Sequence, residues 1–113
     1  MKPATRAQIV DGIEARGVVA IIRIADGSML QSVASALIDG GVTTIEVTMT
    51  VPGAIELIAG LAGTLPAGVT LGAGTVLDAA TALASAELVP PVALSRRDSG
   101  DCSCAASSFW SVA

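Results

Sequence analysis

The fold of this chain is decided by the stretch Thr43-Thr44-Ile45-Glu46-Val47-Thr48-Met49-Thr50. Side chains alternate across a β-strand, so Glu46 shares one face with the even-numbered threonines, while the apolar residues fall on the other face. Apolar segments come before and after this stretch, which favours a strand inside a sheet over a solvated edge strand. A carboxylate inside a sheet or in the lumen of a barrel requires a partner or a function. Glu46 is therefore the first candidate for a functional residue.

Strand and helix patterns alternate on both sides of this central strand. In chain order the patterns predict a helix over residues 5–16, a strand over 17–23, a helix over 29–38, the central strand over 43–49, a helix over 54–61, a strand over 69–75 and a helix from 77 to 88. The first strand is apolar on both faces, as expected of a parallel strand that is buried on both sides. Strands that alternate with short helices predict a parallel sheet with right-handed crossovers. The fold class is therefore α/β.

Candidate caps mark the ends of these helices. Thr5 is placed to cap the first helix and Gly17 to end it. Asp26 precedes the second helix as a turn and cap residue, and Asp78 lies near the start of the last helix, where the macrodipole favours an anion. We expect these residues to fix the helix boundaries.

Composition limits the size and the partners of the protein. Of the 113 residues, 52% are hydrophobic, 2% aromatic and 14% charged, which indicates one small domain with an aliphatic core. The net charge of −4 and the lack of a basic cluster before Arg96-Arg97 argue against a nucleic-acid partner. The N-terminus lacks the apolar segment of a signal peptide, and no apolar run reaches the roughly 18 residues of a membrane-spanning helix. We therefore expect a cytoplasmic protein without a membrane partner.

The last quarter of the chain differs from the rest. After Glu87 no apolar period continues, so the tail of residues 88–113 is expected to be irregular or disordered. Cys102 and Cys104 lie one residue apart in this tail, and the chain contains no histidine. This spacing does not complete a zinc site, so no metal is expected. The structured domain is predicted to span residues 1–87.

Several residues near strand ends allow two interpretations each. Gly72-Ala73-Gly74 resembles the start of a dinucleotide fingerprint, but Leu77 stands where the third glycine belongs, and small residues that let the backbone and a ligand approach closely are the better interpretation. Arg23 is either a solvated charge or a ligand contact, because ligands gather at the carboxyl ends of parallel strands. Glu46 is either a functional carboxylate or a structural partner of Arg23. Thr75 is either a ligand contact or a helix cap.

Three segments resemble a known family: GVVAIIR over residues 17–23, GGVTTIEVTMTVP over 40–52 and LGAGTVL over 71–77. They are similar to the aldolases that act on 2-keto-3-deoxy-6-phosphogluconate (KDPG) and 4-hydroxy-2-oxoglutarate (KHG), and the resemblance covers about residues 5–87. It implies a (β/α)₈ TIM barrel with an extra N-terminal helix, of which this chain would supply the first three strands, in a homotrimer. The implied reaction needs no cofactor: a lysine Schiff base cleaves KDPG to pyruvate and glyceraldehyde 3-phosphate, or KHG to pyruvate and glyoxylate.

The resemblance also implies roles for single residues. Glu46 matches the family's proton-shuttling glutamate, and Arg23 and Thr75 match positions that hold the anionic end of the substrate. Thr50 stands where some members have an arginine, so the carboxylate contact differs here. The family's lysine belongs to the sixth strand, whereas Lys2 is the only lysine in this sequence. We therefore expect a truncated chain that lacks the nucleophile and is inactive.

The tail has an explanation at the level of codons. Members of the family continue after the third helix with segments such as Ala-Gly-Ala and then Val-Ser-Pro-Gly. When codons for these segments are read in another frame, they encode the residues found at 87–90 and 95–99. We therefore expect a frameshift near residue 85. The alternative function is a small non-enzymatic α/β module that binds an anion at residues 72–75. Such a self-sufficient module should cover the edges of its sheet, whereas a fragment should leave them open.

Overall fold

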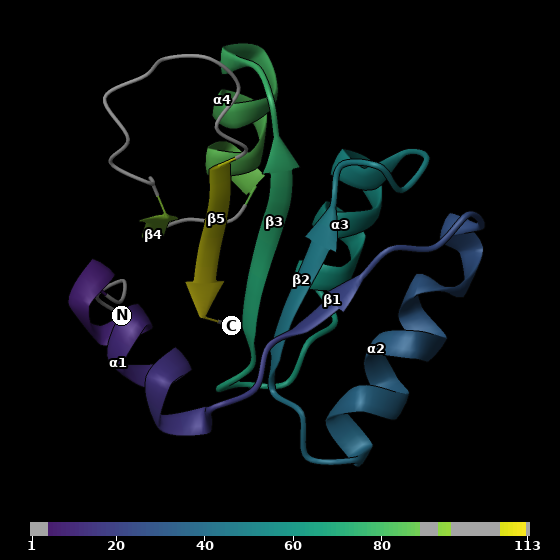
Figure 1. Cartoon of the computed structure of the whole chain (residues 1–113). Coiled ribbons are helices and arrows are strands. Elements are labelled where there is room, and N and C mark those ends of the chain that lie inside the picture. The colour runs from purple at the N-terminus through teal and green to yellow at the C-terminus, as the bar shows by residue number, and fades with distance from the viewer. Residues whose placement is uncertain (1–4, 89–92, 96–106, 113) are drawn as a thin grey trace.

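Figure 1 shows a computed structural model of the chain, which describes residues 5–88, 93–95 and 107–112. The elements are α1 (Arg6–Arg16), β1 (Ala20–Ile22), the 3₁₀ turn η1 (Gly27–Met29), α2 (Leu30–Asp39), β2 (Thr44–Thr48), α3 (Ala54–Ala62), β3 (Thr70–Val76), α4 (Ala79–Leu88), β4 (Ala93–Ser95) and β5 (Ser107–Val112). Every predicted helix and all three predicted strands are present, in the predicted order. The strands β4 and β5 were not predicted.

The five strands form one sheet in the order β1-β2-β3-β5-β4. Strands β1, β2 and β3 run parallel, whereas β5 pairs antiparallel with both β3 and β4. The chain is therefore α/β, and its three parallel βα units are compatible with the first units of a TIM barrel. Within the residues described, no helix is long and apolar enough to cross a membrane.

The predicted caps of α1 are present, whereas Asp26 caps the 3₁₀ turn η1 and α2 begins at Leu30 without a side-chain cap. The Thr5 hydroxyl accepts from the Gln8 amide, and the Gln8 side chain accepts from the Thr5 amide, which forms a capping box at α1. Gly17 ends α1 in the left-handed conformation, with φ 72°. Asp26 accepts from the Ser28 amide at η1, and Asp78 accepts from an amide in the first turn of α4. Because Gly17 caps the helix, β1 begins at Ala20 and is shorter than predicted.

The core lies between one face of the sheet and the helices α2 and α3. The strands contribute Ile22, Ile45, Val47, Leu71 and Ala73, and the two helices contribute Leu30, Ala34, Ala54, Ile58 and Leu61, all of them at most 6% exposed. Figure 1 shows α2 and α3 beside the parallel strands. The strand residues that reach this core are alternate ones, as the central stretch predicts. We call this side of the sheet the apolar face.

One expectation about β1 is wrong. This strand was expected to be buried on both faces, but Ile21 is 61% exposed while its neighbour Ile22 is 4% exposed. The reason is position in the sheet: β1 ends the strand order, and Ile21 points away from the helices. An apolar residue on an edge strand therefore does not report burial by itself.

The tail is described only at β4 and β5. Strand β5 pairs with the edge of β3 that faces away from β2, with Trp110 opposite Gly72. The expectation of an irregular tail falls mainly on residues 89–92, 96–106 and 113, which lie outside the described residues, as do Arg96-Arg97 and both cysteines. The sequence gives no apolar alternation at residues 93–95, which is why a strand was not predicted there.

Candidate functional site

The second face of the sheet carries polar residues, and we call it the polar face. It is formed by Thr44, Glu46 and Thr48 of β2 and by Thr70, Gly72 and Gly74 of β3. Residues paired across parallel strands point to the same side, and the register pairs Thr44 with Thr70, Glu46 with Gly72 and Thr48 with Gly74. The three buried threonines are at most 1% exposed, and Glu46 is half-buried. Glu46 thus lies on an interior strand, as its sequence context indicates.

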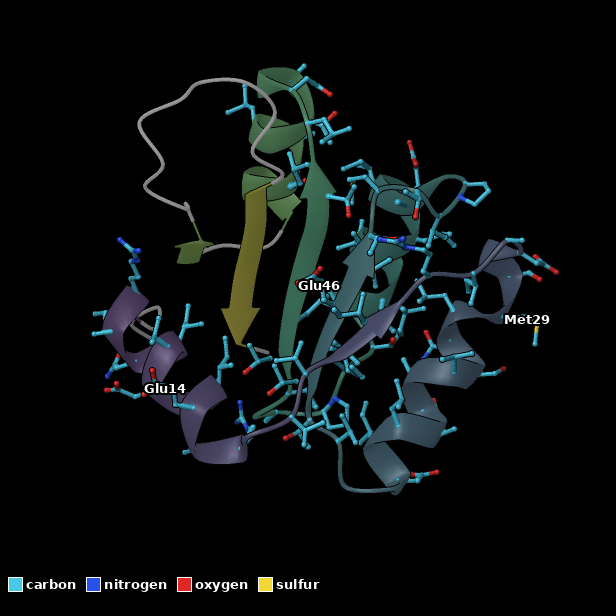
Figure 2. All side chains as sticks on the ribbon, viewed as in Figure 1. Glu14, Met29 and Glu46 are labelled. Carbon is cyan, nitrogen blue, oxygen red and sulfur yellow. The ribbon has the colours of Figure 1, made fainter. Side chains whose placement is uncertain are left out.

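Glu46 lies in the middle of this face rather than at its margin. Figure 2 shows its side chain over the centre of the sheet, between the ribbons of β2 and β3. Glu14 on α1 and Met29, the last residue of η1 before α2, lie at the periphery in the same view. The strands on either side of β2 are β1 and β3, in which Ile21 and Gly72 are the residues paired with Glu46.

Two predicted site residues follow or end the neighbouring strands. Arg23 comes directly after Ile22, which pairs with Val47, so Arg23 is level with Thr48 at the carboxyl end of the sheet. Thr75 follows Gly74 near the end of β3 and is half-buried, whereas Arg23 is exposed. The parallel arrangement therefore places both residues at the same end of the sheet.

Thr75 has a strained backbone. Among the residues described, it is the only non-glycine with a positive φ, 58°. The left-handed region is disfavoured for a β-branched residue, and such residues cost of order 1–3 kcal/mol and gather at functional sites. The pairing of β3 with β5 is also irregular between Ala73 and Val76. This distortion coincides with a residue that the sequence singled out.

Thr50 is tied to the end of β2 through Thr48. Their hydroxyl oxygens lie 2.6 Å apart, within hydrogen-bond distance. Thr50 itself is exposed. The position at which some family members carry an arginine therefore lies at the solvent side of the strand end, and a short hydroxyl stands there in this chain.

The opposite end of the polar face is held by α1. Arg16 donates from Nη1 to the Thr70 hydroxyl at 2.6 Å and from Nη2 to the Gly68 carbonyl at 2.7 Å. The neighbouring Thr44 hydroxyl is buried and has no hydrogen-bond partner among the residues that the structure describes. Arg16 thus links the end of the first helix to the start of the third strand, and sequence reasoning did not identify this contact.

The Glu46 side chain lies where a side chain on Gly74 would be. A Cβ on residue 74 would lie 2.5 Å from Cδ and 3.0 Å from Cγ of Glu46, and closer still to Oε1. The sequence predicted that these glycines admit the backbone and a ligand; at Gly74 the approaching group is a side chain of the protein itself. The glycine run was the available signal, but the cross-strand neighbour could not be read from it.

A surface groove lies elsewhere, on the side of the helices. It is lined by Gly27, Ser28, Leu30, Gln31, Glu56, Leu57, Gly60 and Leu61. It therefore contains none of the predicted site residues. Within the part of the chain that the structure describes, no group of three or more acidic, cysteine or histidine residues could hold a metal ion.

The chain matches a protein-family model over more than half of its length. Residues 9–89 match the aldolase family described as KDPG and KHG aldolase. A search of curated proteins found no match. The matched range includes the polar face, Arg23 and Thr75, and it ends where the sequence pattern changes.

Proposed function

Because the chain belongs to the family of KDPG and KHG aldolases, we propose that its polar face is the acid–base and anion-binding part of an aldolase site. The reaction is the reversible cleavage of KDPG to pyruvate and glyceraldehyde 3-phosphate, or of KHG to pyruvate and glyoxylate, through a lysine Schiff base. The observation that carries the proposal is a half-buried carboxylate on an interior strand of the matched region. The same proposal includes assembly into a homotrimer in the cytoplasm.

Glu46 is the proposed proton shuttle. General acid–base catalysis requires a carboxylate that is held in place and partly shielded from water, and mid-strand positions are more rigid than loops. On β3 its neighbours on the same face are the glycines Gly72 and Gly74, and on β1 its paired residue is Ile21. The competing role, a structural partner of Arg23, predicts a loss of stability rather than of turnover when the charge is removed.

Arg23 and Thr75 are the proposed anion contacts. A guanidinium offers a planar pair of donors to a carboxylate or phosphate, and a hydroxyl adds a third donor. Both residues lie at the carboxyl end of the parallel strands, where ligands of such sheets bind. The strained φ of Thr75 supports a role beyond packing, because strain of this kind persists where the surrounding structure enforces it.

The 113-residue chain lacks the lysine amine that the chemistry needs. Lys2, the only lysine, precedes α1 and lies outside the matched range. We therefore propose that this chain forms no Schiff base and is inactive. Incubation with pyruvate and borohydride should label no specific site, with a lysine-dependent aldolase as positive control. Stoichiometric labelling, or release of pyruvate from KDPG or KHG, would contradict this part of the proposal.

The proposed explanation is a frameshift near residue 85, which would make the tail a product of the wrong frame. A one-base correction of the gene should then continue into a fourth strand and, further on, into the strand that carries the lysine. Sequencing the locus tests this directly. A clean frame with no aldolase sequence in either shifted frame would reject the frameshift.

The second candidate is a non-enzymatic module that binds an anion at residues 72–75. One observation favours it: β5 covers the edge of β3 that a bare three-stranded fragment would expose. Titration with inorganic phosphate, followed by amide chemical shifts, distinguishes the anion-binding module from the aldolase site. Saturable shifts confined to residues 72–76 would favour the module, and their absence would remove it.

A further inference from the structure

Gly74 is conspicuous on the polar face because its backbone does not require glycine. Its φ lies outside the left-handed region, unlike Gly17, Gly41, Gly53 and Gly68. Glycine within a strand is unfavourable because it has no side chain to pack and loses more conformational freedom on folding. An interior strand glycine with an ordinary φ usually marks a place where another group approaches closely.

The group that approaches is the side chain of Glu46. With Cδ 2.5 Å and Cγ 3.0 Å from the position of a Cβ on residue 74, no side chain fits there while the carboxylate keeps its place. Gly27 shows a different case, since its nearest neighbours are an apolar Leu57 methyl group and a backbone carbonyl. At Gly74 the space is taken by the proposed acid–base group itself.

The register shows the direction in which Glu46 leans. Its Cα pairs with Gly72, but its carboxyl group lies over Gly74, two residues further along β3. Two residues of a parallel strand span about 6.6 Å. The side chain thus carries the carboxylate across to β3 and toward the carboxyl end of the sheet. Arg23 follows β1 and Thr75 follows Gly74 at that same end.

We propose that Gly74 is a positioning residue for Glu46: its missing side chain leaves the space in which the carboxylate leans toward the carboxyl ends of the strands. The importance of this position for catalysis rests on the proposed function, but the positioning itself does not. An alanine at residue 74 displaces the carboxylate without straining the backbone. The displaced group then meets a different set of neighbours, while the strand remains intact.

The test uses the 113-residue chain and needs no turnover. Glutamate side-chain carboxyl carbons are labelled with carbon-13, and the Glu46 signal is assigned with Glu46→Gln. In Gly74→Ala the Glu46 resonance and its titration curve should both shift relative to the unsubstituted chain. Gly60→Ala is the control, because a Cβ at Gly60 meets no atom of the described residues within 4 Å. That control should leave the Glu46 signal unchanged.

A double-mutant cycle separates positioning from general damage to the strand. Gly74→Ala should lower the denaturant midpoint less in a Glu46→Ala background, because the group that competes for the space has been removed. An unchanged Glu46 signal in Gly74→Ala, or equal midpoint losses in both backgrounds, would overturn the proposal. Such a result would reject the positioning role of Gly74 but not the aldolase assignment. Conversely, a negative result in the pyruvate or turnover experiments would reject the proposed function but would not change the Glu46 signal or the double-mutant cycle.

Discussion

The two faces of the parallel sheet use alternate residues of the same strands for different purposes. On the apolar face, Ile45 and Val47 are fully buried beneath α2 and α3. On the polar face, Glu46 lies between them in sequence and is half-buried over glycine. Because the side-chain period of a strand is two, one strand supplies both stability and a candidate acid–base group without compromise between them. Substitutions on the two faces should therefore have separable effects.

The largest expected effect is on turnover, at Glu46 in an enzyme restored to the full reading frame. Glu46→Gln keeps the size of the side chain but removes the exchangeable proton, so kcat should fall about 10² to 10⁴-fold. The denaturant midpoint should change little. The measurement is kcat per folded enzyme together with that midpoint, with Glu56→Gln on the exposed side of α3 as the control.

The competing structural role of Glu46 predicts the reverse result. If the carboxylate mainly pairs with Arg23, its neutralisation should cost on the order of 3 kcal/mol of stability. Turnover per folded molecule would then stay near that of the unsubstituted enzyme. A normal kcat with a lowered midpoint would thus remove Glu46 from the proposed chemistry and assign it to the scaffold.

The next effect is on stability and compares adjacent residues of β1. Ile22→Ala should lower the free energy of unfolding by about 2–5 kcal/mol, because it opens a cavity beside α2. Ile21→Ala should change it by less than about 0.5 kcal/mol, because this side chain is 61% exposed. Urea unfolding of both variants gives the comparison. Equal losses would mean that a second layer covers the polar face at β1.

The smallest expected effect lies outside both faces, at the start of α4. Hydrogen bonds from the Thr81 amide and hydroxyl to the Asp78 carboxylate lower the pKa of Asp78 below its ordinary value of 3.8. The unfolded chain therefore binds the proton more readily than the folded chain. The stabilisation is complete above that ordinary value and is lost as the pH falls through the lower pKa of the folded state.

Asp78→Asn tests this dependence. Denaturant midpoints between pH 7 and pH 3 should fall less steeply at the acidic end in the variant, because asparagine can still cap the helix but does not titrate. Asp39, exposed at the end of α2, offers a control in Asp39→Asn. If the denaturant midpoint falls equally with decreasing pH in the unsubstituted chain and in Asp78→Asn, this cap does not contribute to the pH dependence of stability.

Local sequence predicted the elements because their determinants are local. The capping box of Thr5 and Gln8, the left-handed Gly17 and the Asp78 cap each depend on residues within one helical turn. The alternation at residues 43–50 separated the two faces of β2 for the same reason. The site residues Glu46, Arg23 and Thr75 were singled out by their places in or at the ends of strands. Their roles came from the resemblance of three segments to a family and stay predictions.

The contacts that sequence reasoning missed join residues far apart in the chain. The Arg16 side chain reaches Thr70, and β5 pairs with β3, across separations that no local pattern encodes. The exposure of Ile21 was misjudged because an apolar run is the same at an edge and in a sheet interior. The left-handed φ of Thr75 likewise depends on how β3 ends, not on the residue type.

By itself, then, the sequence determined the α/β order, the helix ends and the face on which Glu46 lies, because propensity, capping and strand alternation act over a few residues. Only the tertiary structure decided that the Glu46 carboxylate lies over Gly74, toward the carboxyl end of the sheet. The strand register sets this contact, and register depends on how β2 and β3 pack together against the helices. A glycine in a strand indicates that another group approaches its backbone closely, but the fold determines which group that is.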